Sequence, residues 1–180
     1  MLLENGDRIV FAGDSVTDMG SANPVGEGLF ESLGNGYVRE IENLMTAWYP
    51  ELNIRVTNSG ISGNTSRDLA ARFDRDVVDL KPDWVSICIG INDVWRQFDV
   101  PAISEAAVMP QEYESNMEEM ILKIKDHVKG IFIISPYYIE AFCKIQHSSK
   151  LAWDRVHPNR MGAMLQAKEF VKHIDFDFNR

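Results

Sequence analysis

Four short strand-like segments, separated by segments with helical periodicity, constrain the fold of this chain more than any other feature. The strand-like segments cover residues 9–11, 53–58, 84–89 and 131–134. Between and after them, apolar residues recur at helical spacing, from Tyr37 to a stop at Pro50, over residues 65–80, over about 111–128 and over 159–174. The residues after Asp93, through Pro101 and Pro110, are expected to form a loop. Strands that alternate with helices in this way predict a parallel sheet with helices on both faces.

The first three of these strands end in small and polar residues. Asp14 and Ser15 follow the first strand, a glycine-rich turn at residues 59–65 follows the second, and Asn92 follows the third. In a parallel sheet of this kind, ligands bind at the carboxyl ends of the strands. We therefore expect Ser15, Gly63 and Asn92 to be neighbours at one edge of the sheet.

Ser15 lies where α/β enzymes place a nucleophile, just past a strand and at the start of a turn. Asp14, Ser15 and Thr17 are also good turn and helix-cap residues, so residues 8–18 alone fit both interpretations about equally well. A catalytic serine needs a base, an acid that orients the base, and donors for the oxyanion. The choice between the interpretations therefore depends on the rest of the chain.

His157 has the neighbours that a catalytic base requires. Asp154 precedes it by three residues, in a loop ahead of the last helix. A carboxylate at that spacing can fold back onto one ring nitrogen and leave the other facing a serine. His127, by contrast, lies at a helix end, where a cation suits the helix dipole. An Asp-x-x-His pair alone is usually a surface pair, but together with Ser15 it becomes a candidate for catalysis.

Composition and charge exclude several classes of function. With 180 residues, 45% of them hydrophobic and 25% charged, the chain is expected to form one globular domain over residues 1–180. The net charge of -9 argues against a nucleic-acid partner and gives no attraction to an anionic membrane.

Targeting and redox signals point to the cytoplasm. No apolar stretch is long enough to span a membrane, and the first residues lack the pattern of a secretory signal. The only cysteines are Cys88 and Cys143, which excludes a disulfide framework, and Cys88 is expected to be a small buried side chain. No cluster of histidines and cysteines suggests a metal.

The chain resembles the SGNH (GDSL-type) hydrolases, because it contains all four of their sequence blocks in order. Gly-Asp-Ser occupies residues 13–15, Gly-Ile-Ser-Gly-Asn-Thr residues 60–65, Gly-Ile-Asn-Asp residues 90–93, and Asp-Arg-Val-His-Pro residues 154–158. Within this family the chain looks most similar to bacterial carbohydrate acetylesterases of the acetylxylan type. Residues 34–37, 58–68 and 90–97 carry that finer resemblance.

The resemblance implies a three-layer α/β/α sandwich around a flavodoxin-like parallel sheet, and a role for each matched residue. Ser15 is the expected nucleophile, His157 the general base and then acid, and Asp154 its orienting partner. The backbone N–H groups of Ser15 and Gly63 and the side-chain amide of Asn92 are the expected oxyanion donors. No metal or cofactor is implied.

The expected substrate is a small acylated molecule, in particular an acetylated sugar such as a xylo-oligosaccharide. Trp95 could form a wall against a sugar ring or acyl group, although ordinary packing beside the sheet explains it equally well. Asp14 and Tyr37 are further candidates for substrate binding. A lysophospholipid or thioester acyl substrate, handled by the same three catalytic residues, is the alternative.

The chain departs from the family between residue 136 and Asp154. Family members normally place another helix and a fifth parallel strand there, and residues 137–153 are too few for both. Because both ends of this segment lie at the same sheet edge, a direct loop can still bring His157 to Ser15. A displaced His157 would instead leave a catalytically impaired remnant.

The missing strand would make residues 131–134 an apolar sheet edge, which invites pairing with another chain. We therefore expect residues 137–153 or a second subunit of a homo-oligomer to cover this edge.

Overall fold

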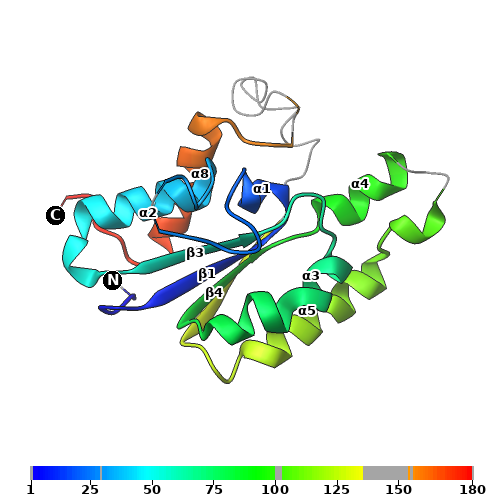
Figure 1. The fold of residues 1–180 in the computed structure, drawn as a ribbon, viewed down its shortest axis with the longest axis horizontal. Helices are drawn as coiled ribbons and strands as arrows, with labels where there is room; N and C mark the ends of the chain where they lie inside the picture. The colour runs from blue at the N-terminus through cyan, green and yellow to red at the C-terminus, as the bar shows by residue number, and fades with distance from the viewer. Residues whose placement is uncertain (1, 29, 100–102, 136–153, 155, 180) are drawn as a thin grey trace.

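The computed structural model describes residues 2–28, 30–99, 103–135, 154 and 156–179, and it contains a five-stranded sheet between two layers of helices (Figure 1). The strand order is β2-β3-β1-β4-β5. The parallel strands are β1 (Arg8–Gly13), β3 (Arg55–Gly60), β4 (Trp84–Cys88) and β5 (Gly130–Ile134), whereas β2 (Gly26–Glu27) pairs antiparallel with β3. The predicted parallel sheet is confirmed.

β1 is the central strand, and its alternating side chains serve both layers. Ile9 and Phe11 belong to the apolar cluster on one face, and Val10 belongs to the cluster on the other. This division follows from the two-residue repeat of a strand. Since β1 is buried on both faces, its residues read as the continuous apolar run seen in the sequence.

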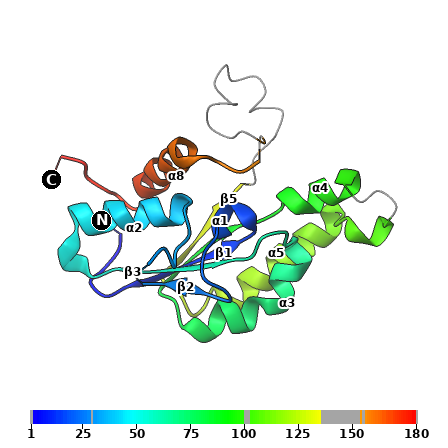
Figure 2. The same cartoon turned by 45° about the horizontal axis from the view of Figure 1, so that its top comes forward.

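The helices form one layer on each face of the sheet (Figures 1 and 2). Helices α2 (Tyr37–Trp48) and α8 (Arg160–Lys172) cover the Phe11 face, and α3 (Ser66–Asp76) and α5 (Pro110–Ile124) cover the Val10 face. The ring of Phe11 lies 5.3 Å from the ring of Phe170, which anchors α8 to the sheet. The predicted three-layer α/β/α arrangement is confirmed.

Two short helices begin at the carboxyl ends of the central strands. Helix α1 (Ser15–Asp18) follows β1, and α4 (Ile91–Asp99) follows β4. Single 3-10 turns lie at η1 (Pro50–Leu52), η2 (Val78–Leu80) and η3 (Ser104–Ala106). These positions bring the polar turns of the sequence to one edge of the sheet.

Helix α4 corrects the sequence prediction, which placed a loop after Asp93. Residues 91–99 contain neither glycine nor proline, and Asp93 lies in the first turn, where a carboxylate favours the helix dipole. The loop interpretation gave too much weight to Pro101. Strand β2 was also not predicted, because a two-residue strand in a glycine-rich segment has no pattern of its own.

The sheet ends at β5 in the part of the chain that the structure describes. No further parallel strand lies beyond β5 among these residues, and α8 is the next described helix. Residues 137–153, which we expected to cover this edge, lie outside the described residues. The two ends of the chain meet, since the N–H of Leu2 donates to the carbonyl of Ile174 at 3.0 Å.

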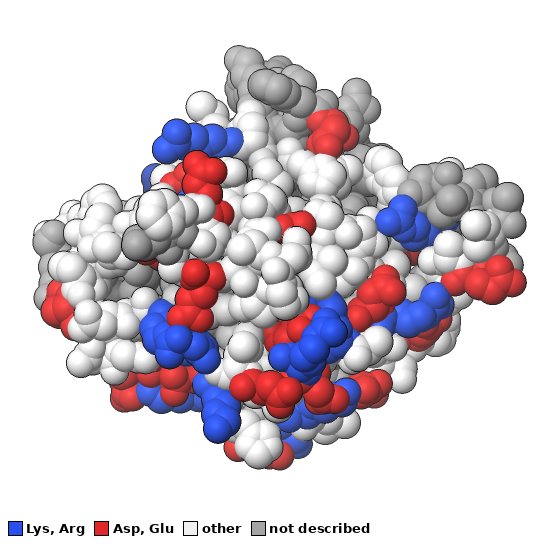
Figure 3. Space-filling view, viewed as in Figure 1, with Lys and Arg blue, Asp and Glu red and all other residues white. Residues whose placement is uncertain are grey.

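The structure shows where the charged side chains and Cys88 lie. Acidic and basic side chains are mixed on the face shown in Figure 3, without a large patch of one sign. Cys88 is buried and not in a disulfide, as expected, and burial raises the pKa of its thiol. None of the helices that the structure describes is long and apolar enough to cross a membrane.

Candidate active site

The end of β1 presents Ser15 at the start of helix α1. Asp14 caps this helix, and its carboxylate accepts the N–H of Val16 at 3.0 Å. A side chain at Gly13 would place its Cβ atom 2.3 Å from the carbonyl oxygen of Cys88 and from Oγ1 of Thr17. Only glycine therefore allows this close approach of β1, α1 and β4. Ser15 itself remains partly exposed.

The structure brings Ser15, His157 and Asp154 into one hydrogen-bonded row. Nε2 of His157 lies 2.7 Å from Oγ of Ser15, and Nδ1 of His157 lies 2.5 Å from Oδ2 of Asp154. If Nδ1 carries the proton, it donates to the carboxylate, and Nε2 is free to accept the serine hydroxyl proton. This is the arrangement that activates a serine nucleophile.

Local hydrogen bonds fix the positions of Asp154 and His157 relative to each other. Oδ1 of Asp154 accepts the backbone N–H groups of His157 at 2.8 Å and of Val156 at 3.0 Å. Two residues after His157, the side chain of Asn159 caps α8 by accepting the N–H of Met161 at 3.0 Å. Because α8 is packed on the sheet, its capped start fixes the place of the histidine.

The carboxyl group of Asp154 has an unusually low pKa. Partial burial raises the pKa, but the ring and backbone hydrogen bonds from His157, together with the N–H of Val156, lower it to about 2. Asp154 is therefore charged at neutral pH. A carboxylate in this place can orient the imidazole and stabilise it when it gains a proton.

The three turns predicted to meet are linked at this edge. The N–H of Ile61 donates to the carbonyl of Gly13 at 3.1 Å, and Nδ2 of Asn92 donates to the carbonyl of Asn64 at 2.9 Å. Gly63 lies between these two contacts, and its φ of 85° is in the region that favours glycine. An amide has two N–H donors, so Asn92 keeps one beyond its bond to Asn64.

Two buried carboxylates, those of Asp18 and Asp93, hold the glycine-rich turn at residues 59–65 and the residue after it. Neither was among the catalytic residues expected from the sequence. Oδ2 of Asp18 accepts both the N–H of Ser62, at 3.1 Å, and its hydroxyl, at 2.5 Å. Asp93 accepts the N–H of Ser66 at 3.0 Å and its hydroxyl at 2.5 Å. Burial raises the pKa of Asp93. Asp18 thus joins α1 to the middle of the turn, and Asp93 joins α4 to the first residue of α3, directly after the turn.

Sequence reasoning missed several of these supporting residues. The side chain of Asn58, buried on β3, donates to the carbonyls of Thr17 at 2.7 Å and Leu33 at 2.9 Å. The only available signal was an amide in a strand at the sheet centre. Arg72 on α3, which donates to Ser59, Asn64 and Gly13, was missed for a similar reason, because a single arginine in an amphipathic helix is usually solvent-exposed.

The three substrate-binding candidates differ in accessibility. Asp14 is 1% exposed and Tyr37 is buried, with its hydroxyl 3.1 Å from Oγ1 of Thr17. Neither side chain presents the exposed surface that the predicted contact with substrate needs, because each is engaged in capping or packing. Trp95, on α4, is 38% exposed and can meet a ligand.

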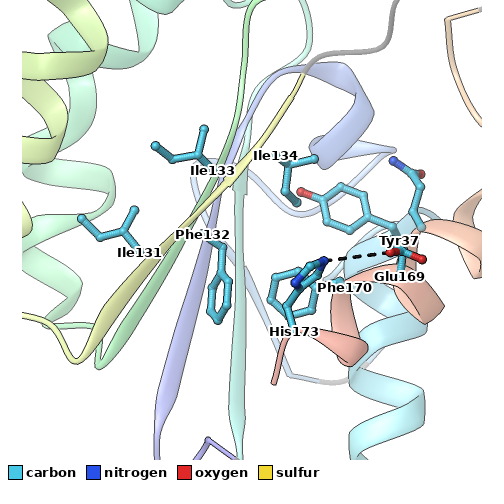
Figure 4. Close-up of a pocket in the computed structure, with 9 residues that line it drawn as sticks. Tyr37, Ile131, Phe132, Ile133, Ile134, Glu169, Phe170 and His173 are labelled. Carbon is cyan, nitrogen blue, oxygen red and sulfur yellow. Dashed lines mark ion pairs between the residues drawn. The ribbon is translucent and has the colours of Figure 1, made fainter. Parts of the chain in front are cut away.

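A cavity of about 510 Å³ lies between β5 and α8 (Figure 4). Ser15, His157 and Asp154 are not among the described residues that line it. Phe132, Ile134 and Phe170 give it apolar walls. At one side, Nε2 of His173 lies 4.0 Å from Oε1 of Glu169. In the described part of the chain, no three His, Cys, Asp or Glu residues gather as a metal site.

The sequence matches a model of the GDSL-like lipase/acylhydrolase family over residues 11–177. The chain belongs to this family. It is 43% identical to an acetylxylan esterase from Geobacillus stearothermophilus, over an alignment of 217 residues that covers all of this chain and 99% of the relative. The relative therefore contains residues without a counterpart among the 180 of this chain, as expected for a shortened member.

Solved structures show the same fold. The crystal structure of Axe2, an acetylxylan esterase from Geobacillus stearothermophilus, has a TM-score of 0.92 at 42% identity and covers 98% of both chains. LAE5, an α/β hydrolase from a lake metagenome, has a TM-score of 0.89 at 36% identity and covers 96% of both. This GDSL-type chain is thus a carboxylic ester hydrolase with the SGNH fold.

Proposed function

We propose that this GDSL-family chain is a serine esterase that removes acetyl groups from xylo-oligosaccharides or related sugars. The observation that carries the proposal is the hydrogen-bonded row from Ser15 Oγ through His157 to Asp154, with contacts of 2.7 and 2.5 Å. An intact row also argues against an impaired remnant, because the shortened chain still brings His157 to Ser15.

The proposed reaction has two halves. Oγ of Ser15 attacks the ester carbonyl carbon while Nε2 of His157 takes the hydroxyl proton, and the N–H groups of Ser15 and Gly63 and the amide of Asn92 stabilise the oxyanion. The C–O bond to the sugar breaks, and His157 gives its proton to the departing sugar oxygen. Water, deprotonated by His157, then cleaves the acetyl-Ser15 ester, releases acetate and restores the serine.

Relatives and one exposed ring support the sugar substrate. The Geobacillus relative is an acetylxylan esterase, and related solved structures include catalytic mutants of it in which a serine, an aspartate or a histidine is replaced by alanine. Trp95, three residues after Asn92 on α4, is partly exposed, and aromatic faces suit the apolar side of a sugar ring.

Acetate release from acetylated xylo-oligosaccharides tests the proposal. We expect Ser15→Ala to abolish turnover and keep the fold, whereas Ser115→Ala, at an exposed serine on α5, should behave as wild type. Trp95→Ala should raise KM for the sugar substrate more than for p-nitrophenyl acetate. Activity retained by Ser15→Ala would refute the nucleophile. Faster turnover of a lysophospholipid or an acyl thioester than of the sugar would refute the substrate class.

A further inference from the structure

Arg72 on α3 is a largely buried arginine that contacts three separate segments of the candidate site. Its Nη2 donates to the carbonyl of Gly13 at 3.0 Å, its Nε to Oδ1 of Asn64 at 2.7 Å, and its Nη1 to Oγ of Ser59 at 3.1 Å. Only 9% of the side chain is exposed. One guanidinium thus joins the end of β1, the end of β3 and the turn that follows β3.

Burying this cation is unfavourable on its own. Desolvation lowers the pKa of Arg72, and Asp76, one turn further along α3, opposes that shift with Oδ2 at 3.2 Å from Nη1. A buried ion pair is often no more stable than apolar residues of similar volume. Stability alone therefore gives a weak reason for an arginine here, and the contacts it makes give a stronger one.

The groups that Arg72 holds lie next to the reacting groups. Gly13 precedes Asp14 and Ser15, and its carbonyl also accepts the N–H of Ile61 at 3.1 Å. Asn64 follows Gly63, and its backbone carbonyl accepts the side-chain amide of Asn92 at 2.9 Å. Arg72 therefore bridges the strand that leads to the nucleophile and the turn that carries Gly63 and holds the side chain of Asn92.

We propose that Arg72 is a positioning residue that fixes the separation between Ser15 and the oxyanion donors Gly63 and Asn92. This inference rests on the proposed function. A planar guanidinium can give several donors in fixed directions, which a lysine ammonium cannot reproduce. A misplacement of about 1 Å between reacting groups can lower a rate by about 10²-fold.

Arg75 provides a matched control on the same helix. Its Nε lies 2.6 Å from Oδ1 of Asp76, so it pairs with the same carboxylate as Arg72. Its side chain is 69% exposed, and its Nε and Nη2 both donate to Asp76. Arg75→Met removes one of the two positive charges beside Asp76 and leaves the contacts of Arg72 with Gly13 and Asn64 in place.

The test compares Arg72→Lys, Arg72→Met, Asn64→Ala and Arg75→Met by kcat, KM and melting temperature. We expect Arg72→Lys to keep a melting temperature near wild type, because it keeps a cation beside Asp76, but to lose about 10²-fold in kcat with KM changed less than about threefold. Asn64→Ala should lose about tenfold in kcat, since one of several anchors is removed. Arg75→Met should keep the wild-type kcat.

If Arg72 were only a counterion for Asp76, Arg72→Lys would keep both the melting temperature and the kcat of wild type. That result would overturn the inference. The same conclusion follows if Arg75→Met lowers kcat as much as Arg72→Lys. If Arg72→Met fails to fold, Arg72→Lys and Asn64→Ala decide the matter.

A second readout separates this inference from the proposed function. The rate at which a fluorophosphonate modifies Ser15 needs the nucleophile and oxyanion donors but no sugar substrate. If wild type releases no acetate from sugars yet is modified at Ser15, the proposed substrate is wrong, and slower modification of Arg72→Lys still supports the positioning role. Equal modification rates in wild type and Arg72→Lys would contradict it.

Discussion

At Asp14, burial and charge are in conflict. Its side chain is 1% exposed, and burial raises the pKa of its carboxyl group to about 6, against the opposing effects of the Val16 N–H and the His157 charge. The negative charge of Asp93 raises it further. The folded protein therefore holds this proton more tightly than the unfolded chain, whose reference value is 3.8.

The sign of the resulting pH dependence follows from that difference. The stabilising contribution of protonated Asp14 is complete below about pH 4 and is lost as pH rises through about 6. An asparagine in its place would keep the cap, since its side chain also accepts a backbone N–H. We predict that Asp14→Asn, relative to wild type, gains about 2–2.5 kcal/mol of unfolding free energy between pH 4 and pH 7.5.

Urea unfolding at several pH values measures this gain, with Asp126→Asn as a control for the loss of one exposed charge. A difference between Asp14→Asn and wild type that stays constant from pH 4 to pH 7.5 would contradict the raised pKa of Asp14.

Residues with a distinctive chemical pattern could be predicted, and residues that act through burial could not. The sequence made Ser15 and His157 candidates, because Ser15 lies just past a strand and His157 follows Asp154 by three residues. Asp18 ends a helix of four residues and Arg72 lies on a helix with several other charged residues, so nothing in their spacing indicated that their side chains point inward. Only the packing of α1 and α3 against the sheet shows what they hold.

At the scale of elements, the start of α3 depends on a carboxylate from another helix. Thr65 and Asp68 form a capping box at this end, and Asp93 on α4 accepts the N–H and hydroxyl of Ser66. Nδ2 of Asn116 on α5 donates to the same hydroxyl at 3.0 Å. Three helices thus meet at Ser66.

We predict that Asp93→Ala lowers the unfolding free energy by about 2–3 kcal/mol, because a charged acceptor is removed from buried donors. Asp79→Ala, at an exposed position on η2, should change it by less than about 0.5 kcal/mol. Denaturant titration of both variants provides the measurement. Equal stabilities for the two would mean that Asp93 does not hold the start of α3.

Long elements with a clear period were predictable, and short ones were not. The α2 prediction began at Tyr37 and ended before Pro50, which matches the structure to within two residues. Helix α4 was missed because its neighbouring prolines suggested a loop. β2 forms because it can pair with the free edge of β3, and this pairing depends on the tertiary fold and not on the local sequence.

At the scale of the whole molecule, β5 forms the sheet edge in the described part of the chain. Ile133 on β5 is 56% exposed, whereas its neighbours Phe132 and Ile134 pack against the core cluster that contains α8. An apolar edge of this kind favours association with another chain. This edge could be predicted from the sequence because residues 137–153 are too few for another helix and strand.

We predict that the protein is a homo-oligomer in solution and that Ile133→Lys weakens the assembly, because a charge on an edge strand opposes pairing. Sedimentation velocity over a range of concentrations measures the species present. Leu122→Lys, at an exposed apolar residue of α5, is the matched control. A wild-type monomer at all concentrations would contradict the prediction.

Above all, we propose that the shortened chain uses His157 as the catalytic base for Ser15. Peptide mass spectrometry after timed exposure to a fluorophosphonate tests this most directly, with His157→Ala compared against His173→Ala, an exposed histidine directly after α8. We predict modification at Ser15 alone, slowed about 10²–10⁴-fold by His157→Ala and unchanged by His173→Ala. Modification at another residue, or an equal rate in wild type and His157→Ala, would contradict the proposal.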